Sequence, residues 1–351
     1  MRNTAVLIVD DSVVVRRMLS RMIDEFPGFE VAASAASGPA ALELISSRSV
    51  DVITLDVDMA PMNGLEFLDE LKRRKVHLPV LMLSSLTSKG TEVTLEALLR
   101  GAADYIQKPS SDLPLGDFAD ELRKKLQSLV TRERWAPRPR VEGATRGARS
   151  SGRFSLVAIG ASTGGPEALT QVLRDLPGDF PIPILIVQHM PPQFTGPFAQ
   201  RLNEKCAVQV LHAEHGMRVD GGCVYVAPGG RHMVLNRSLG GELEVVLNDK
   251  PLLHGCRPAV DHLLESIVDY RPKQTLVALL TGMGADGASG ALELRNRGAT
   301  VLVQDKATSV VWGMPGSAVR LNAVDRVLPL NEIAPTIDRM CRTAVSMAGA
   351  Y

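Results

Sequence analysis

One serine in the second half of the sequence stands where a nucleophile could act. Ser162 lies in a glycine-rich turn, residues 160–165, that follows a short apolar run and precedes a helix-like stretch. Glycines let such a turn fold tightly, and the helix after it would offer free N–H groups to an oxyanion. The turn fits the G-x-S-x-G pattern of serine hydrolases. The pattern alone is weak, because glycine-rich turns more often bind phosphate or only reverse the chain.

A serine nucleophile needs a base and an acid that orients the base. Of the seven histidines, only His189 directly follows a long apolar run, and a neutral imidazole accepts a proton near pH 7. Asp249, Asp286 and Asp305 are candidates for the acid. We prefer Asp286, because the glycines around it allow other loops to approach closely. The chain order Ser, His, Asp differs from the order in α/β-hydrolases, so the pattern does not predict that fold.

The segment GMGADG, residues 282–287, allows a different interpretation. It is a literal G-x-G-x-x-G, and Asp305 follows about twenty residues later, as in dinucleotide-binding folds. Asp286 would bring negative charge against the pyrophosphate, and Ser162 would be left unexplained. A third hypothesis is a phosphorylation-dependent binding module whose second half only docks a partner. The complete Ser/His/Asp set argues against that module, so the esterase-type site ranks first.

Carboxylates in the first half of the sequence also stand at the ends of apolar runs. Asp10 and Asp11 follow the first run, Asp56 follows a later one, and Ser84 and Lys108 follow two more. Carboxylates packed together repel each other, and hard oxygen ligands suit Mg²⁺. A lysine and a hydroxyl beside them could contact a phosphoryl group. An acidic pair after a strand is often only a helix cap, but the joint pattern predicts a site that phosphorylates an aspartate and senses the result.

Both halves alternate short apolar runs with amphipathic stretches, which predicts an α/β protein with two doubly wound parallel sheets. The expected strands lie at 5–9, 50–55, 79–83 and 105–106, then at 156–159, 182–187, 224–226, 276–280 and 300–303. The expected helices of the first half lie at 12–25, 38–46, 64–75 and 91–99. Ligands bind at the carboxyl ends of strands in such sheets, which is where the candidate residues stand.

Charge divides the chain. Residues 131–153 hold seven arginines against two glutamates and no Leu, Ile or Phe, so we expect a flexible basic linker there. The whole chain balances 39 basic against 39 acidic side chains, which excludes nucleic-acid or membrane-surface binding driven by bulk charge. The sequence has no apolar run of about 18 residues and no signal-peptide pattern at its start. Four cysteines without C-x-x-C spacing suggest reduced thiols, so we expect a cytoplasmic protein with no nucleic-acid partner and no membrane insertion.

Residues 1–125 resemble a response-regulator receiver domain, a flavodoxin-like fold. The segments VLIVDDS, ITLDVDM and MLSS and the later KP carry the resemblance. It implies that Asp56 accepts a phosphoryl group and that Mg²⁺ is the cofactor of this step. The resemblance gives roles to six residues: metal ligands Asp10, Asp11 and Asp56, switch residues Ser84 and Tyr105, and the phosphoryl contact Lys108. The loop after the phosphoacceptor strand departs from the family's usual Met-Pro-x-Met-Asp-Gly: Pro61 stands one position later, and Asn63 stands in place of the aspartate. The detailed geometry of this loop can therefore differ from that of the family.

Residues 154–345 resemble the Rossmann-like catalytic domain of the chemotaxis protein-glutamate methylesterase (CheB) family, behind a linker at 126–153. The segments IGASTGGPEAL, VQHMPPQFT, LTGMGADGASG and GATVLVQDKATSVVWGMPGSAV carry the resemblance. It implies Ser162 as nucleophile, His189 as base and acid and Asp286 as orienting acid, the residues chosen above from their positions. The backbone N–H groups of Thr163 and Met283 are plausible oxyanion donors.

The resemblance also implies an activity and its partners. The substrates would be methyl-accepting chemoreceptors, which lose methyl esters from glutamate side chains and have specific glutamines deamidated. A chemotaxis-type histidine kinase would phosphorylate Asp56, and this would relieve a cover that the receiver places on the catalytic cleft. The esterase chemistry would need no cofactor.

Overall fold

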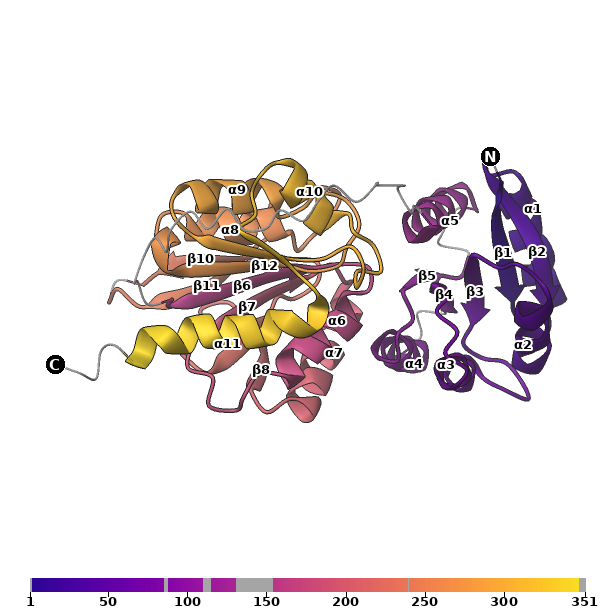
Figure 1. The fold of residues 1–351 in the computed structure, drawn as a ribbon, viewed down its shortest axis with the longest axis horizontal. Helices are drawn as coiled ribbons and strands as arrows, with labels where there is room; N and C mark the ends of the chain where they lie inside the picture. Colours follow the sequence, from indigo (N-terminus) through magenta and orange to yellow (C-terminus); the bar gives the residue numbers. More distant parts are fainter. Residues whose placement is uncertain (1, 85–87, 110–114, 131–153, 239, 347–351) are drawn as a thin grey trace. The chain divides into compact units, whose positions relative to one another are not determined.

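The computed structural model describes residues 2–84, 88–109, 115–130, 154–238 and 240–346 (Figure 1). The chain divides into two compact units, Met1–Arg134 and Trp135–Tyr351. No helix in these described ranges is both long enough and apolar enough to span a membrane.

The first unit is a parallel sheet of five strands in the order β2-β1-β3-β4-β5, the flavodoxin-like arrangement that the sequence predicts. Its strands are β1 (Thr4–Val9), β2 (Phe29–Ala35), β3 (Val52–Asp56), β4 (Val80–Ser84) and β5 (Asp104–Gln107). Its helices are α1 (Val13–Asp24), α2 (Gly38–Ser47), α3 (Gly64–Arg73), α4 (Ser88–Leu99) and α5 (Leu115–Val130). The apolar-run criterion missed β2, because only the two ends of this edge strand are buried.

Local hydrogen bonds explain where two helices of this unit begin. The Ser12 hydroxyl accepts the Val15 N–H (3.4 Å) at the start of α1. At α3 the Asn63 side chain accepts the Glu66 N–H (2.9 Å), while the Glu66 carboxylate accepts the Asn63 N–H (3.0 Å). This reciprocal capping box gives the unusual Asn63 a structural role. The loop departure noted in the sequence therefore still leads into a regular helix.

The first unit extends further than its expected end at residue 125. Helix α5 continues to Val130, because Leu122, Leu126 and Leu129 recur on one face and are buried. Residues 131–153, the predicted basic linker, lie outside the described residues.

The second unit contains a parallel sheet of seven strands in the order β14-β13-β12-β6-β7-β9-β8. The strands are β6 (Leu156–Ala161), β7 (Ile184–Gln188), β8 (Gln209–His212), β9 (Cys223–Val226), β12 (Thr275–Leu279), β13 (Thr300–Gln304) and β14 (Arg326–Leu328). The helices are α6 (Gly165–Arg174), α7 (Pro192–Lys205), α8 (Val260–Ile267), η1 (Pro272–Gln274), α9 (Ala288–Asn296), α10 (Met314–Arg320) and α11 (Leu330–Ser346). Helices α8, α9 and α10 cover one face of the sheet, and α6, α7 and α11 cover the other (Figure 1). The doubly wound prediction is confirmed for this unit as well.

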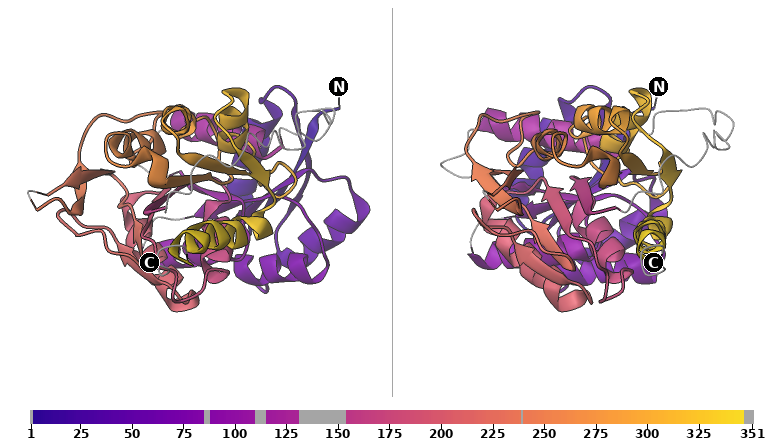
Figure 2. Two further views of the ribbon diagram at one scale, coloured as in Figure 1. Left: turned by 60° about the vertical axis from the view of Figure 1, so that its left-hand side comes forward. Right: turned by 90° about the vertical axis from the view of Figure 1, so that its left-hand side faces the viewer.

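An antiparallel ribbon of β10 (His232–Arg237) and β11 (Leu243–Asn248) was not predicted. Both strands are partly exposed, so neither forms a continuous apolar run. The ribbon, orange in Figure 2, packs against α8, where the Ser266 hydroxyl accepts the Leu235 N–H (3.0 Å).

Candidate active site

The candidate residues of the second unit gather where the winding of the sheet changes direction. Strand β6 lies between β7 and β12, and the chain runs from β6 toward β7 and later returns to β12. Ser162 follows β6, His189 follows β7, and the loop that carries Asp286 follows β12. This is the switch point at which doubly wound sheets bind their ligands.

Asp286 holds one nitrogen of the His189 ring. Its Oδ2 lies 2.7 Å from His189 Nε2 and accepts the Val260 N–H (2.7 Å), while its Oδ1 accepts the Asp261 N–H (2.9 Å). The carboxylate is buried at the first turn of α8. Burial would raise the pKa of Asp286, but the bonds from His189 and the two N–H groups outweigh burial and hold that pKa below its ordinary value. A carboxylate that stays charged can orient the ring and stabilise its protonated form.

The other nitrogen of His189 faces a thiol. Nδ1 lies 3.5 Å from Cys256 Sγ. Burial alone would lower the pKa of His189, but the bonds to Asp286 and Cys256 outweigh burial and raise that pKa to about 9. Since Asp286 accepts the Nε2 proton, Nδ1 is the nitrogen that can take a proton from a nucleophile.

Ser162 lies in a turn that other loops approach closely. Its carbonyl accepts the Gly165 N–H (2.7 Å) and the Gln188 Nε2–H (3.0 Å). A Cβ at Gly282 would lie 2.8 Å from the Ser162 Cβ, so the loop after β12 needs glycine there. Among the described residues, no hydrogen bond joins the Ser162 hydroxyl to His189. Catalytic hydrogen bonds of free enzymes often form only when substrate binds.

Two backbone groups beside Ser162 were expected to stabilise an oxyanion. Thr163 is buried directly before Gly164, which has a φ of 77° and caps the N-terminus of α6. Met283 is 40% exposed, and no acceptor within the described ranges takes its N–H. Both residues therefore border the turn that holds Ser162, on the loops after β6 and β12.

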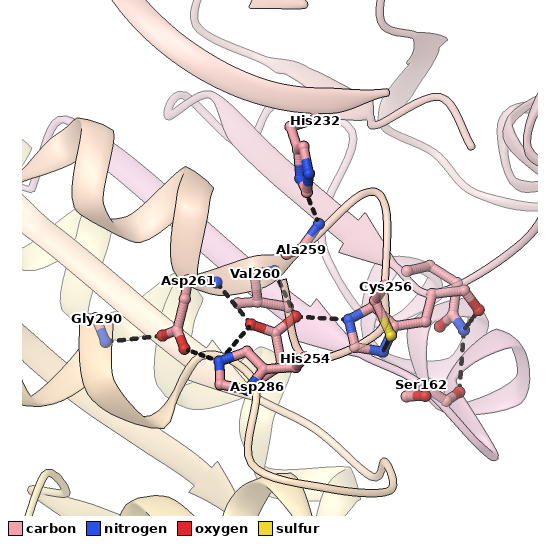
Figure 3. A network of polar contacts seen from close by, with 11 residues as sticks. Ser162, His232, His254, Cys256, Ala259, Val260, Asp261, Asp286 and Gly290 are labelled. Carbon is pink, nitrogen blue, oxygen red and sulfur yellow. Dashed lines mark hydrogen bonds and ion pairs between the residues drawn. The ribbon is translucent and has the colours of Figure 1, made fainter. Parts of the chain in front are cut away.

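Four residues of this site were not singled out from the sequence: Gln188, His254, Cys256 and Asp261. Gln188 ends β7, and its Nε2 donates to the carbonyls of Ser162 and His189 (3.0 and 3.1 Å), so it joins the backbones of the nucleophile and the base. Gln188 stands at the end of an apolar run, and this position could have identified it as a candidate site residue. The other three lie in or after an irregular loop, and only the fold brings them to the site (Figure 3).

A second histidine–aspartate pair lies behind the first (Figure 3). His254 Nε2 lies 2.7 Å from Asp261 Oδ2, and Asp261 Oδ1 accepts the Gly290 N–H (2.8 Å) in the first turn of α9. His254, Asp261 and Asp286 are close enough to share a cation. Since hydrogen bonds already use these ring and carboxylate atoms, we assign no metal there.

The dinucleotide interpretation of GMGADG does not fit this arrangement. A pyrophosphate would bind at the N-terminus of the helix after the loop, which is α9. The Asp261 carboxylate already occupies that terminus. Asp305, the expected ribose ligand, accepts the N–H and hydroxyl of Thr308 (2.9 and 2.7 Å) within its own turn. The remaining acid candidate, Asp249, pairs with Arg231 at the surface (3.1 Å).

In the first unit, the three predicted carboxylates do meet. Asp10, Asp11 and Asp56 each offer an oxygen, and these atoms lie within 4.8 Å of one another. Lys108 Nζ lies 2.8 Å from Asp56 Oδ1 and 3.2 Å from Asp10 Oδ2. In the described structure the buried Asp10 Oδ2 has no hydrogen-bond partner and pairs with the Lys108 ammonium, which a metal ion could displace. Burial raises the pKa of Asp56, and Lys108 offsets this only in part.

The two switch candidates contact neighbouring polar groups. The buried Ser84 hydroxyl contacts the Thr94 hydroxyl of α4, which itself donates to the Gly90 carbonyl (2.6 Å). Tyr105 is half-buried, and burial raises its pKa. The Lys125 ammonium lies 5.4 Å from the centre of the Tyr105 ring. The sequence did not indicate Thr94, although it is the contact that links Ser84 to α4.

Comparisons with known proteins match both units. Residues 157–337 match the family model described as CheB methylesterase, and residues 6–117 match the response regulator receiver domain. A protein-glutamate methylesterase/protein-glutamine glutaminase from Burkholderia lata is 42% identical over 341 residues, covering 94% of this chain and 93% of that protein. One from Pectobacterium atrosepticum is 43% identical over 338 residues, covering 95% and 96%.

A solved structure resembles the second unit. The CheB methylesterase catalytic domain of Thermotoga maritima matches with a TM-score of 0.52 and 40% identity. The match covers 53% of this chain and 98% of that domain.

Proposed function

The chain belongs to the CheB methylesterase family and carries a response regulator receiver domain ahead of its catalytic domain, and from this we propose that it demethylates chemoreceptors by a Ser-His-Asp mechanism under phosphorylation control. Family membership confirms both resemblances and makes the chain a protein-glutamate methylesterase/protein-glutamine glutaminase. The observation that carries the mechanism is the 2.7 Å bond between His189 Nε2 and Asp286 Oδ2 beside the turn of Ser162.

Acylation begins when Ser162 Oγ attacks the carbonyl carbon of a γ-glutamyl methyl ester. His189 Nδ1 accepts the serine proton, because Nε2 is bonded to Asp286. The ionised Asp286 holds the ring tautomer and stabilises the imidazolium that forms. His189 then returns the proton to the methoxide oxygen as the C–O bond breaks, and methanol leaves the acyl-enzyme.

The backbone N–H groups of Thr163 and Met283 would stabilise the oxyanion of each tetrahedral intermediate, and one such donor contributes about 3 kcal/mol. Deacylation repeats the proton transfers with water as the nucleophile and frees the glutamate carboxylate. A glutaminyl amide would follow the same route and release ammonia in place of methanol. The same Ser162, His189 and Asp286 thus account for both activities in the relatives' name.

The receiver site would control this chemistry. The fit of Asp10, Asp11 and Asp56 around one point supports Mg²⁺ binding, in which the ion would take the place of Lys108 at the buried Asp10 Oδ2. Bound Mg²⁺ would neutralise charge on the incoming phosphoryl group. Asp56 would accept that group from a chemotaxis-type histidine kinase in the cytoplasm, and Lys108 would move from Asp56 to the phosphoryl oxygens. The Ser84 hydroxyl would then turn from Thr94 to the new acceptor.

Methanol release from methylated receptor membranes tests the proposal. Wild type, Ser162→Ala and Asp56→Ala are compared with and without a small phosphodonor. We expect release to vanish in Ser162→Ala and the phosphodonor response to vanish in Asp56→Ala, which should keep its basal activity. Absence of release from wild type with cognate receptors would overturn the esterase mechanism. An unchanged phosphodonor response in Asp56→Ala would overturn the control by this aspartate.

A further inference from the structure

A two-residue hairpin beside the catalytic centre presents Cys256 to His189. Leu253 and Cys256 form an isolated antiparallel bridge with two backbone bonds (3.1 and 2.9 Å). His254 and Gly255 between them have φ values of 53° and 74°. Two successive left-handed residues form the tight turn typical of such hairpins. The backbone therefore fixes the direction in which the Cys256 side chain leaves the loop.

The hairpin is anchored on both sides of its turn. His254 Nε2 bonds to the buried Asp261 carboxylate (2.7 Å), which is itself held by Gly290 N–H. The Arg257 guanidinium donates to the carbonyls of Asp249 and Lys250 (3.2 and 3.1 Å). These bonds tie the segment to α8, α9 and the end of the β10–β11 ribbon, so the Cys256 thiol has a defined place.

The other three cysteines of the chain have different surroundings. Burial raises the pKa of Cys206 to about 11 and that of Cys341 to about 12. Cys223 Sγ donates to Gln209 Oε1 (3.4 Å). Among the described residues, Cys256 is the only cysteine that forms a hydrogen bond with a histidine, and its Sγ lies 3.5 Å from His189 Nδ1. Figure 3 shows Cys256 between the labelled Asp286 and Ser162.

The contact has a consequence for the base. The Asp286 carboxylate accepts the Nε2 proton, so Nδ1 of the neutral ring accepts a weak bond from the Cys256 thiol. After His189 gains a second proton, Nδ1–H can donate to the sulfur instead. The same neighbour thus accommodates both states of the ring. A weak thiol donor can also give up Nδ1 to a serine hydroxyl more easily than a strong donor could.

We propose that Cys256 is a positioning residue for His189: its thiol and Asp286 hold the ring between them, fixing the orientation in which Asp286 takes Nε2 and Nδ1 is left for the serine proton, and supporting the protonated ring. The inference rests on the proposed function only in taking His189 as the base. Within the described ranges, Asp286 and Cys256 are the titratable groups that bond to the ring, and His254 and Asp261 lie behind Asp286. The contribution of Cys256 to the raised pKa of His189 agrees with this role.

The test is the titration of the His189 ring by NMR in the full-length chain. Wild type, Cys256→Ala and Cys256→Ser are compared, and His189→Gln assigns the resonance. Without the sulfur, the neutral ring loses a weak thiol bond, whereas the protonated ring loses a stronger, charge-assisted bond, so we expect the His189 pKa in Cys256→Ala to fall by roughly 0.5 unit or more. Cys256→Ser keeps a polar partner and should restore part of the difference. The acid limb of kcat/KM for methanol release should move to lower pH in step with the ring.

Cys206→Ala is the matched control, since it removes a thiol far from any histidine contact and should leave the titration unchanged. Thermal unfolding of each variant shows whether the catalytic domain is folded under the conditions of the titration. An identical His189 titration in wild type and folded Cys256→Ala would overturn the proposal, as would a Cys256→Ser titration no closer to wild type than that of Cys256→Ala. A ring shift in an enzyme that releases no methanol would support the positioning role while refuting the proposed function.

Discussion

Replacing Asp286 by Asn should remove the main stabiliser of the protonated His189 ring. The pKa of His189 is about 9, against an ordinary value of 6.5, and this difference corresponds to about 3 kcal/mol of interaction with the protonated ring. The hydrogen bond to Asp286 is the largest of the causes that raise this pKa, and the contact with Cys256 is the next. The amide also turns an N–H₂ group toward His189 or toward the backbone N–H groups of α8, and a buried donor without an acceptor costs about 1–3 kcal/mol.

The loss should depend on pH with a defined sign. A group whose pKa is raised by folding stabilises the protein fully below its unfolded pKa, and this stabilisation disappears as pH rises through the folded pKa. For His189 this window runs from about 6.5 to about 9. The lowered pKa of Asp286 adds stability above its ordinary value, 3.8, which is lost at lower pH. The difference between wild type and Asp286→Asn should therefore be largest near pH 6 and shrink above pH 9.

Calorimetry of the full chain at several pH values measures the difference, and methanol release measures the activity. We expect a fall in kcat of about 10³–10⁴-fold, the size known for loss of the orienting carboxylate in serine-protease triads. Asp305→Asn, at the end of the neighbouring strand β13, is the control and should change little. The reasoning is refuted if Asp286→Asn shows a stability difference independent of pH, or keeps more than about a tenth of wild-type kcat.

Three further predictions concern close packing and the receiver switch. Gly282→Ala places a Cβ 2.8 Å from the Ser162 Cβ and so displaces the nucleophile. Methanol release should fall more than tenfold, which corresponds to an increase of about 1.4 kcal/mol in the activation free energy, while the circular dichroism spectrum stays native. Unchanged release would contradict this prediction. Asp56→Asn should abolish incorporation of phosphoryl groups from a labelled phosphodonor, and persistent labelling would show another acceptor. Thr94→Val removes one hydroxyl that Ser84 contacts and so weakens the hold of α4 on the Ser84 hydroxyl; half-maximal activation should need several-fold less phosphodonor. A shift in the other direction would contradict the switch role of this contact.

Regular elements were predictable where burial on both faces produces apolar runs. Strands β1, β3, β6 and β7 lie inside the two sheets and are buried along nearly their whole length. The edge strand β2 and the β10–β11 ribbon were missed, because partly buried and exposed residues interrupt the apolar runs of these strands. Helix α5 runs past residue 125, the expected end of the receiver domain, because Leu126 and Leu129 continue its buried face.

The sequence by itself determined which side chains follow which strands, because strand ends can be recognised from local patterns. Parallel strands of one sheet end at a common edge, and this predicts that Asp10, Asp56, His189 and Asp286 lie near their partners. Only the tertiary structure decided that His189 meets Asp286 through Nε2 and leaves Nδ1 to Cys256. The physical reason is that a ring's orientation depends on every group packed around it. Here these include a thiol from a hairpin 67 residues away in the chain, a contact that no local pattern encodes.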